Sequence, residues 1–161
     1  GTYADEKSGI VPPVFRGIYI PHDRFEEFRE SLAALEKAMH TPLPYSGFAT
    51  DGVYAFWPQL TLRTAADKQK MLKLYDAFVK IVYGHGGSVV AEAGEGRMKA
   101  PFIEKRISPE LTKLYADLRL IFDPYGTLNA GVKQPVELRT VVAHLRTGYE
   151  GIDFAGYSSP S

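Results

Sequence analysis

The sequence has no cysteine, no long apolar run and no excess of either charge sign. Without cysteine, the chain cannot form a disulfide framework, a thiolate zinc site or a cysteine nucleophile. No apolar run approaches the ~20 residues that a membrane-spanning helix needs, and no secretory signal stands at the start. The 19 basic side chains balance the 19 acidic ones, so no net field draws the chain toward nucleic acid. These absences favour a cytoplasmic globular protein.

Common cofactor and metal motifs are also missing. The glycines do not follow the strand, Gly-x-Gly-x-x-Gly, helix order of dinucleotide-binding folds, and no GxxxxGK[ST] phosphate loop is present. We interpret the Gly86-Gly87 pair as a helix exit and tight turn. The histidines show none of the HxH, HxxxH or HExxH spacings of metal pairs, so we interpret them as helix-end or surface residues: His22, His40, His85 and His144.

The apolar periodicity predicts an α+β protein. The predicted strands and helices alternate as βαββαβ, which is the ferredoxin-like arrangement of an antiparallel sheet covered by helices. The strands are expected at residues 15–20, 45–49, 53–62 and 88–91, with Asp51-Gly52 as a hairpin turn between the middle two. The two covering helices are expected at residues 23–40, capped by Asp23, and from Thr64 or Asp67 to residue 84. Ser108-Pro109-Glu110 predicts a further helix that ends at Asp123-Pro124.

The length of 161 residues suits one domain. We expect residues 1–12 to be a leader or linker, residues 13–135 to be the domain, and residues 136–161 to be a partly flexible C-terminal extension. Because the chain starts with Gly1 rather than Met, we expect it to be part of a longer polypeptide.

Two stretches could carry chemistry. The loop at residues 91–97 reads AEAGEGR, where small residues let other groups approach the backbone and the charges could orient an anionic ligand or pair with each other. The hairpin aromatics could stack on a planar ligand or on bases, but their alternation favours a core role: Tyr45, Phe48, Tyr54, Phe56 and Trp57. RNA binding is disfavoured because no basic stripe and no RNP1 motif accompany them.

The stretch GGSVVAEAGEGRMKAPFIEK…SPELTKLYADLRLIFDPYGTLNAGVK, residues 86–133, resembles the C-terminal domain of FAD-linked oxidases of the glycolate oxidase and D-lactate dehydrogenase type. Those chains show a Gly-Gly-strand, a Gly-Glu-His-Gly-x-Gly loop, and a helix that ends in Asp-Pro-x-Gly-x-Leu-Asn-Pro-Gly-Lys. A weaker match covers residues 13–35. The resemblance implies a cap, or substrate, domain that lies over FAD held mainly by an N-terminal FAD-binding domain of the same polypeptide.

The family's site residues carry over only in part. Glu92 falls at the loop glutamate, whereas Ala93 replaces the histidine that follows it. Gln59 and Thr61 stand at the asparagine and histidine of an Asn-Leu-His-Leu strand, and an upstream histidine falls near Tyr54. The resemblance therefore implies no histidine-held metal. It gives these expected roles: catalytic Glu92 and Tyr54; substrate-binding Arg97, Gln59, Thr61 and Lys99; and cofactor-binding Asn129, in the turn that leads back toward the flavin domain.

Two functions remain open. In the first, the chain is the cap of an FAD-dependent oxidoreductase that oxidises a hydroxyl-bearing small molecule, 2-hydroxy acid-like or another alcohol, and is inactive by itself. Its general base would be a tyrosine, Glu92 or a residue of the absent domain. In the second, the chain is a stand-alone ferredoxin-like module that binds a ligand or partner without catalysis. A weaker alternative is peripheral membrane or subunit docking through Val141, Val142 and Leu145.

Overall fold

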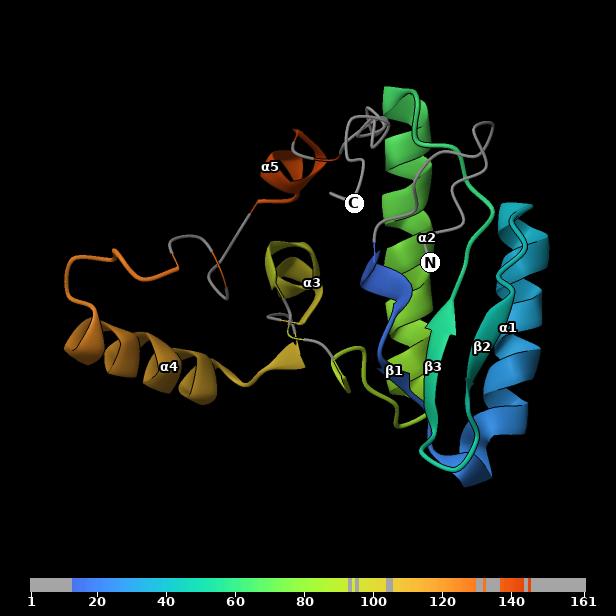
Figure 1. The fold of residues 1–161 in the computed structure, drawn as a ribbon, viewed down its shortest axis with the longest axis horizontal. Coiled ribbons are helices and arrows are strands. Elements are labelled where there is room, and N and C mark those ends of the chain that lie inside the picture. The colour runs from blue at the N-terminus through green and yellow to red at the C-terminus, as the bar shows by residue number, and fades with distance from the viewer. Residues whose placement is uncertain are drawn as a thin grey trace, which may run out of the picture.

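The computed structural model describes residues 13–92, 94, 96–103, 106–129, 132, 137–143 and 145. Its centre is an antiparallel sheet in the order β1-β3-β2, formed by β1 (Ile18–Tyr19), β2 (Tyr45–Phe48) and β3 (Val53–Phe56). Two helices, α1 (Phe25–Met39) and α2 (Ala65–Gly84), lie side by side and cover one face of the sheet (Figure 1). The α+β prediction is confirmed. The predicted leader, residues 1–12, and most of the predicted extension lie outside the described residues.

Three further helices lie on the other side of α2 from α1 (Figure 1): α3 (Gly96–Ile103), α4 (Pro109–Phe122) and α5 (Leu138–Ala143). The sequence analysis did not predict α3, which contains Pro101, or α5. Short 3₁₀ turns occupy Pro13–Phe15 and His22–Arg24. Among the described residues, no helix is long and apolar enough to cross a bilayer.

Two helix starts follow the predicted capping chemistry. The Thr64 side chain accepts a hydrogen bond from the Asp67 backbone N–H, while the Asp67 carboxylate accepts one from the Thr64 N–H, which is a complete capping box. The Ser108 hydroxyl oxygen accepts the Leu111 N–H at the start of α4. The predicted cap of the first helix is wrong, because Asp23 lies in the preceding 3₁₀ turn and Arg24 occupies the N-cap position of α1.

The predicted hairpin is confirmed, and Gly52 in its turn has the left-handed φ of +65° that glycine adopts without strain. The predicted fourth strand is not formed as a strand. Ser88 makes one antiparallel bridge to Tyr19, with two backbone hydrogen bonds of 2.8 and 2.9 Å, and the Ala91 N–H donates to the Gly17 carbonyl at 3.0 Å. Residues 88–91 therefore run beside β1 as an irregular edge, and the complete ferredoxin-like sheet is not confirmed.

Aromatic rings fill the space between the sheet and the two covering helices. Phe78 of α2 is fully buried, and its ring centroid lies 5.0 Å from that of Phe56 on β3 and 6.4 Å from that of Phe28 on α1. Phe15 lies 5.3 Å away on the other side. Because large buried rings contribute more packing area than other side chains, this cluster fixes the helices against one face of the sheet.

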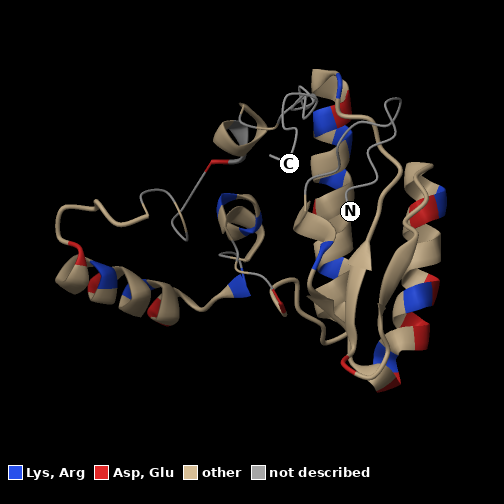
Figure 2. Ribbon diagram, viewed as in Figure 1, with Lys and Arg blue, Asp and Glu red and all other residues tan. Residues whose placement is uncertain are grey.

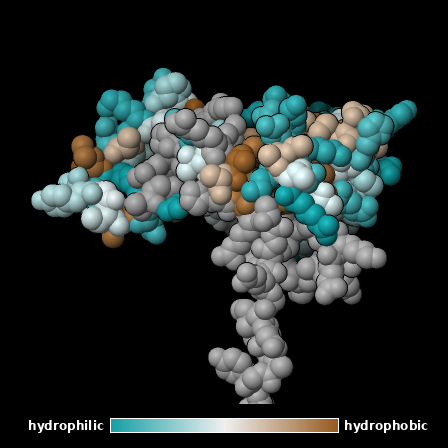
Figure 3. Space-filling model, turned by 90° about the horizontal axis from the view of Figure 1, so that it is seen from above, coloured by the Kyte–Doolittle hydropathy of each residue, from teal (hydrophilic) through white to brown (hydrophobic). Residues whose placement is uncertain are grey.

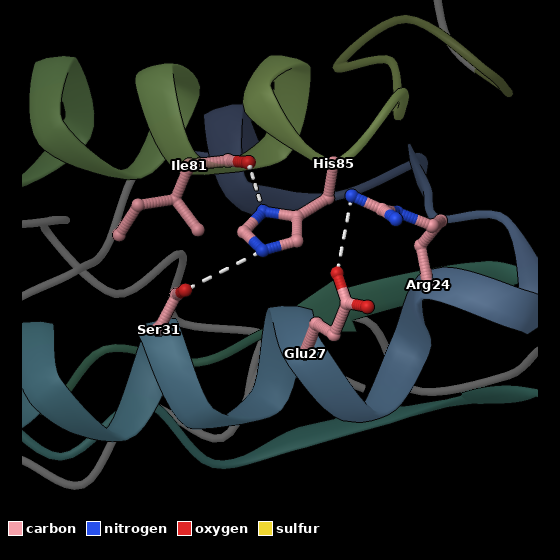
Figure 4. A network of polar contacts seen from close by, with 5 residues as sticks. All are labelled: Arg24, Glu27, Ser31, Ile81 and His85. Carbon is pink, nitrogen blue, oxygen red and sulfur yellow. Dashed lines mark hydrogen bonds and ion pairs between the residues drawn. The ribbon is translucent and has the colours of Figure 1, made fainter.

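A polar contact joins the end of α2 to the middle of α1 (Figure 4). The His85 ring, just after α2, donates from Nδ1 to the Ile81 carbonyl at 2.8 Å, and its Nε2 lies 3.4 Å from the Ser31 hydroxyl of α1. Arg24 and Glu27 form an exposed ion pair at 3.1 Å on the adjacent surface of α1. His85 is thus a helix-end histidine, as predicted, and its ring is engaged in helix packing.

Candidate functional site

The sheet has one covered face and one open face, and the burial pattern shows which side chains lie on each. From Tyr54 to Leu62 every second residue is buried: Tyr54, Phe56, Pro58, Leu60 and Leu62. The residues between them are exposed or half-buried. Since side chains alternate between the faces of a strand, Ala55 and the adjoining Trp57 lie on the open face. The described strands β2 and β3 carry no charged residue (Figure 2).

An aromatic and cationic pair lies on this open face. The Arg16 guanidinium stands 4.5 Å from the centre of the Trp57 ring, a cation–π contact. The Trp57 indole N–H donates to the Ser46 hydroxyl at 3.3 Å, which ties the ring to β2. Arg16 makes no ion pair with any acidic side chain among the described residues, so its charge is held in place by the ring and remains available to an anion. Sequence analysis did not identify Arg16.

Gln59 and Thr61 follow Trp57 along the chain. Both are exposed, and they alternate with the buried Pro58, Leu60 and Leu62. The backbone N–H groups of Trp57 and Gln59 donate to the carbonyls of Pro44 and Pro42, at 2.7 and 3.0 Å, so the chain stays beside the β2 segment although regular strand ends at Phe56. The Leu60 N–H then donates to the Pro58 carbonyl at 3.0 Å, which turns the chain at Gln59, and the Thr61 side chain hydrogen-bonds to Asp67 at the start of α2. The structure therefore does not align Gln59 and Thr61 with Trp57. Their binding role stays a prediction.

The predicted loop lies beside the start of β1. Glu92 follows Ala91, whose N–H is bonded to Gly17, and both Glu92 and Arg97 are exposed. Lys99 is different, because only 4% of it is exposed and its Nζ donates to the Arg16 carbonyl at 2.9 Å and to the Val89 carbonyl at 2.5 Å. Its ammonium therefore joins α3 to the start of β1 and to the irregular edge. Substrate binding by Lys99 would require it to leave these two acceptors.

Tyr54 and Asn129 lie apart from this group. Tyr54 is 6% exposed on the covered face, where its ring stacks on Phe25 at 4.8 Å. Burial, and then the neighbouring Tyr45, raise the pKa of Tyr54, which opposes the ionisation that a general base requires. Asn129, with φ of +49°, lies in the turn that follows α4, and α4 lies away from the sheet (Figure 1). The proposed catalytic role of Tyr54 and cofactor role of Asn129 both stay predictions.

The hairpin aromatics divide between core and surface. Tyr54 and Phe56 are buried, as predicted, whereas Tyr45, Phe48 and Trp57 are exposed by 42%, 74% and 38%. The expected core role is therefore wrong for Phe48 and Trp57, whereas the partly exposed Tyr45 still packs against the rings of Phe25, Tyr54 and Phe56. The apolar C-terminal group also differs from its expectation, because Val141 and Leu145 are buried and do not form an exposed docking surface.

The described residues do not fit FAD or a bound metal as a complete site. The hollow between α2 and α3 has a volume of about 290 Å³ and is lined mainly by Asp76, Lys80, Phe102 and Arg106. It offers no glycine-rich turn at a helix N-terminus where a pyrophosphate could bind. No cluster of three histidine, cysteine or carboxylate side chains suited to a metal occurs in the part of the chain that the structure describes.

Comparison with known proteins decides the family. The model of the family described as FAD linked oxidases, C-terminal domain, matches residues 16–132. The chain belongs to this family. Glycolate oxidase subunit GlcD of Bacillus subtilis (strain 168) is 34% identical over 68 residues, which cover 40% of this chain and 14% of that relative. The resemblance noted in the sequence is thereby confirmed, and the chain matches only a small part of the relative's length.

The Lys99 contact predicts a specific pH dependence of stability. Burial lowers the pKa of Lys99 below its ordinary 10.5, so between the two values the unfolded chain binds more protons than the folded one. The free energy of unfolding should therefore rise with pH in this window, and the gain should be complete above 10.5. Lys99→Met removes this contribution and leaves two carbonyls without their donor, at a cost of about 1–3 kcal/mol.

Urea unfolding of both proteins from pH 7 to pH 11 measures the effect. The stability of the wild type minus that of Lys99→Met should increase with pH. A difference that stays flat or decreases contradicts a buried ammonium at this position. Lys73→Met, an exposed lysine of α2, is the matched control and should show no such trend.

Proposed function

We propose that this chain is the cap domain of an FAD-dependent oxidoreductase that oxidises a hydroxyl-bearing small molecule. The open face of the sheet would lie toward the flavin, which the N-terminal FAD-binding domain of the same polypeptide would hold. The observation that carries the proposal is the open face itself, where the Arg16 guanidinium lies over the exposed Trp57 ring while both covering helices pack on the opposite face. The family match supports the flavin.

The flavin and this chain would contribute different parts of the reaction. The flavin supplies the redox chemistry, and the chain supplies orientation, charge and exclusion of water. Arg16 is suited to a carboxylate, because a guanidinium can donate two parallel hydrogen bonds to its oxygens. Gln59 and Thr61 offer an amide and a hydroxyl for the polar groups of a bound substrate. These groups favour a 2-hydroxy acid over a neutral alcohol, in keeping with the name of the matched relative.

Glu92 is the proposed general base of this chain. It is exposed at the corner that follows the Ala91–Gly17 hydrogen bond, whereas the buried Tyr54 lies on the other side of the sheet. A carboxylate can accept the proton of the substrate hydroxyl when it lies within hydrogen-bond reach of that group. Arg97, exposed on the first turn of α3, is proposed as a second contact for an anionic substrate.

Expression of the longer polypeptide that contains this chain tests the proposed function. It should purify as a yellow protein with a flavin absorption spectrum, and the flavin should be bleached anaerobically by a 2-hydroxy acid. The 161-residue chain alone should be colourless and should not bind FAD in calorimetric titration. A longer polypeptide without flavin would contradict the proposal and favour the alternative of a binding module without catalysis.

Arg16 gives a sharper prediction within the longer polypeptide. Arg16→Gln should raise the KM for a 2-hydroxy acid about 10- to 100-fold, since a hydrogen bond to a charged group contributes about 1.5–3 kcal/mol. The kcat should change less, because the guanidinium binds the carboxylate equally in the substrate and the transition state. The matched control is Lys73→Gln on α2, which should keep the wild-type KM. Equal KM values for wild type and Arg16→Gln would show that Arg16 does not bind the substrate.

A further inference from the structure

Lys99 is a buried charged side chain to which the proposed reaction gives no step. Only 4% of it is exposed, and its ammonium donates to the Arg16 carbonyl at 2.9 Å and to the Val89 carbonyl at 2.5 Å. None of the ion pairs among the described residues includes Lys99. Because a buried ammonium destabilises the folded state unless its donors are satisfied, the two carbonyls are what keep this side chain in place.

The helix that carries Lys99 has a fixed place of its own. Phe102 of α3 is 5% exposed, and its ring meets the Tyr75 ring of α2 edge to face, with the two centroids 4.8 Å apart. Helix α4, which follows α3, buries none of its residues, and apolar surface is visible at the end of the molecule that α4 forms (Figure 3). The reach of Lys99 toward β1 is therefore set by the packing of α3 on α2.

Arg16, the acceptor of one of these hydrogen bonds, lies between a fixed residue and a free one. Phe15 before it is 1% exposed, and its ring centroid lies 5.3 Å from that of Phe78. Gly17 after it has a φ of +64°, in a region that glycine enters and leaves without a steric penalty. The peptide between Arg16 and Gly17 is thus not fixed by sterics alone. The hydrogen bond from Lys99 to its carbonyl oxygen holds its orientation.

The direction of the Arg16 side chain depends on this peptide. The guanidinium stands 4.5 Å from the centre of the Trp57 ring, and the ring is tied to Ser46 of β2 by its indole N–H. A cation–π contact at an exposed position is weak, so by itself it holds a long side chain poorly. A fixed backbone at Arg16 keeps the guanidinium over the ring for more of the time.

We infer that Lys99 is a positioning residue for the anion site that Arg16 and Trp57 form. By holding the Arg16 carbonyl, it keeps the guanidinium ready to bind a carboxylate, without touching the ligand itself. This inference rests on the proposed function, which gives Arg16 the carboxylate of the substrate. The role differs from the direct substrate contact that the family resemblance implies for Lys99.

Quenching of tryptophan emission tests the inference in the 161-residue chain, because Trp57 is its single tryptophan. Iodide is an anion and gathers near a guanidinium, whereas acrylamide is neutral. At constant ionic strength, the ratio of the iodide to the acrylamide quenching constant should fall about 2-fold in Arg16→Gln, the effect of one screened charge close to the ring. Lys99→Met should lower the ratio toward the same value, because the guanidinium no longer stays over the ring.

The double variant separates positioning from the charge of Lys99 itself. In the Arg16→Gln background, Lys99→Met should cause no further decrease, since no guanidinium is left to position. An equal decrease in both backgrounds would mean that Lys99 attracts iodide by its own charge. An unchanged ratio in Lys99→Met would mean that Arg16 keeps its place without Lys99. Either result overturns the inference.

Two further variants control for the fold. Leu35→Ala removes packing from a buried position of α1 and should lower the stability without changing the ratio. A decrease in Leu35→Ala as large as that in Lys99→Met would overturn the inference, because it would show a general loosening of the structure. Lys99→Ala leaves space through which water can reach both carbonyls. It takes the place of Lys99→Met if that variant does not fold, and the same outcomes decide.

The longer polypeptide extends the test to the substrate. Lys99→Met should raise the KM for a 2-hydroxy acid about 3- to 10-fold, with a smaller change in kcat, and should not raise it further in the Arg16→Gln background. A yellow polypeptide in which the two substitutions multiply in KM overturns the inference and leaves the proposed function intact. A colourless polypeptide overturns the proposed function, while the quenching ratios still decide whether Lys99 positions Arg16.

Discussion

The packing of aromatic rings between the sheet and helices α1 and α2 is the constraint on which the rest of the structure depends. Phe78 is fully buried against rings from β3, from α1 and from the 3₁₀ turn before β1. This packing commits one face of a small sheet to the core. The opposite face, with Trp57 and Arg16, is thereby left for other contacts, and the proposed function follows from that division.

The Lys99 ammonium connects this packed core to the candidate site. It donates to the backbone carbonyls of Arg16 and Val89, so one side chain joins α3, the irregular edge of the sheet and the residue that contacts Trp57. A buried ammonium destabilises the folded state unless its hydrogen bonds are kept, and here these are the bonds to the two carbonyls. The Lys99 contact thus serves the site by positioning Arg16 and the Glu92 corner, whether or not its ammonium ever meets a ligand.

Much of the fold could be predicted from local chemistry, and the departures have physical causes. Thr64 with Asp67, and Ser108 with Pro109, mark helix starts because their hydrogen bonds are local. Helix α3 was missed because Gly96 and Pro101 oppose helix formation locally, and packing of its buried residues outweighs them. Gln59 and Thr61 could be named from the resemblance, but Arg16 could not, since its contact with Trp57 joins residues 41 positions apart. The exposure of the apolar face of α4 could not be predicted either, because periodicity identifies an apolar face but not what covers it.

The central claim is that the open face of the sheet lies against the flavin, and Trp57, the single tryptophan of this chain, can report on it. A flavin close to an indole ring quenches its fluorescence by energy transfer. The measurement is the emission of the longer polypeptide minus that of its Trp57→Phe variant, recorded with flavin bound and after flavin removal. The account predicts that the difference emission is strongly quenched with flavin bound and recovers when the flavin is removed. An emission from Trp57 that is the same in both states would place the open face away from the flavin and contradict the account.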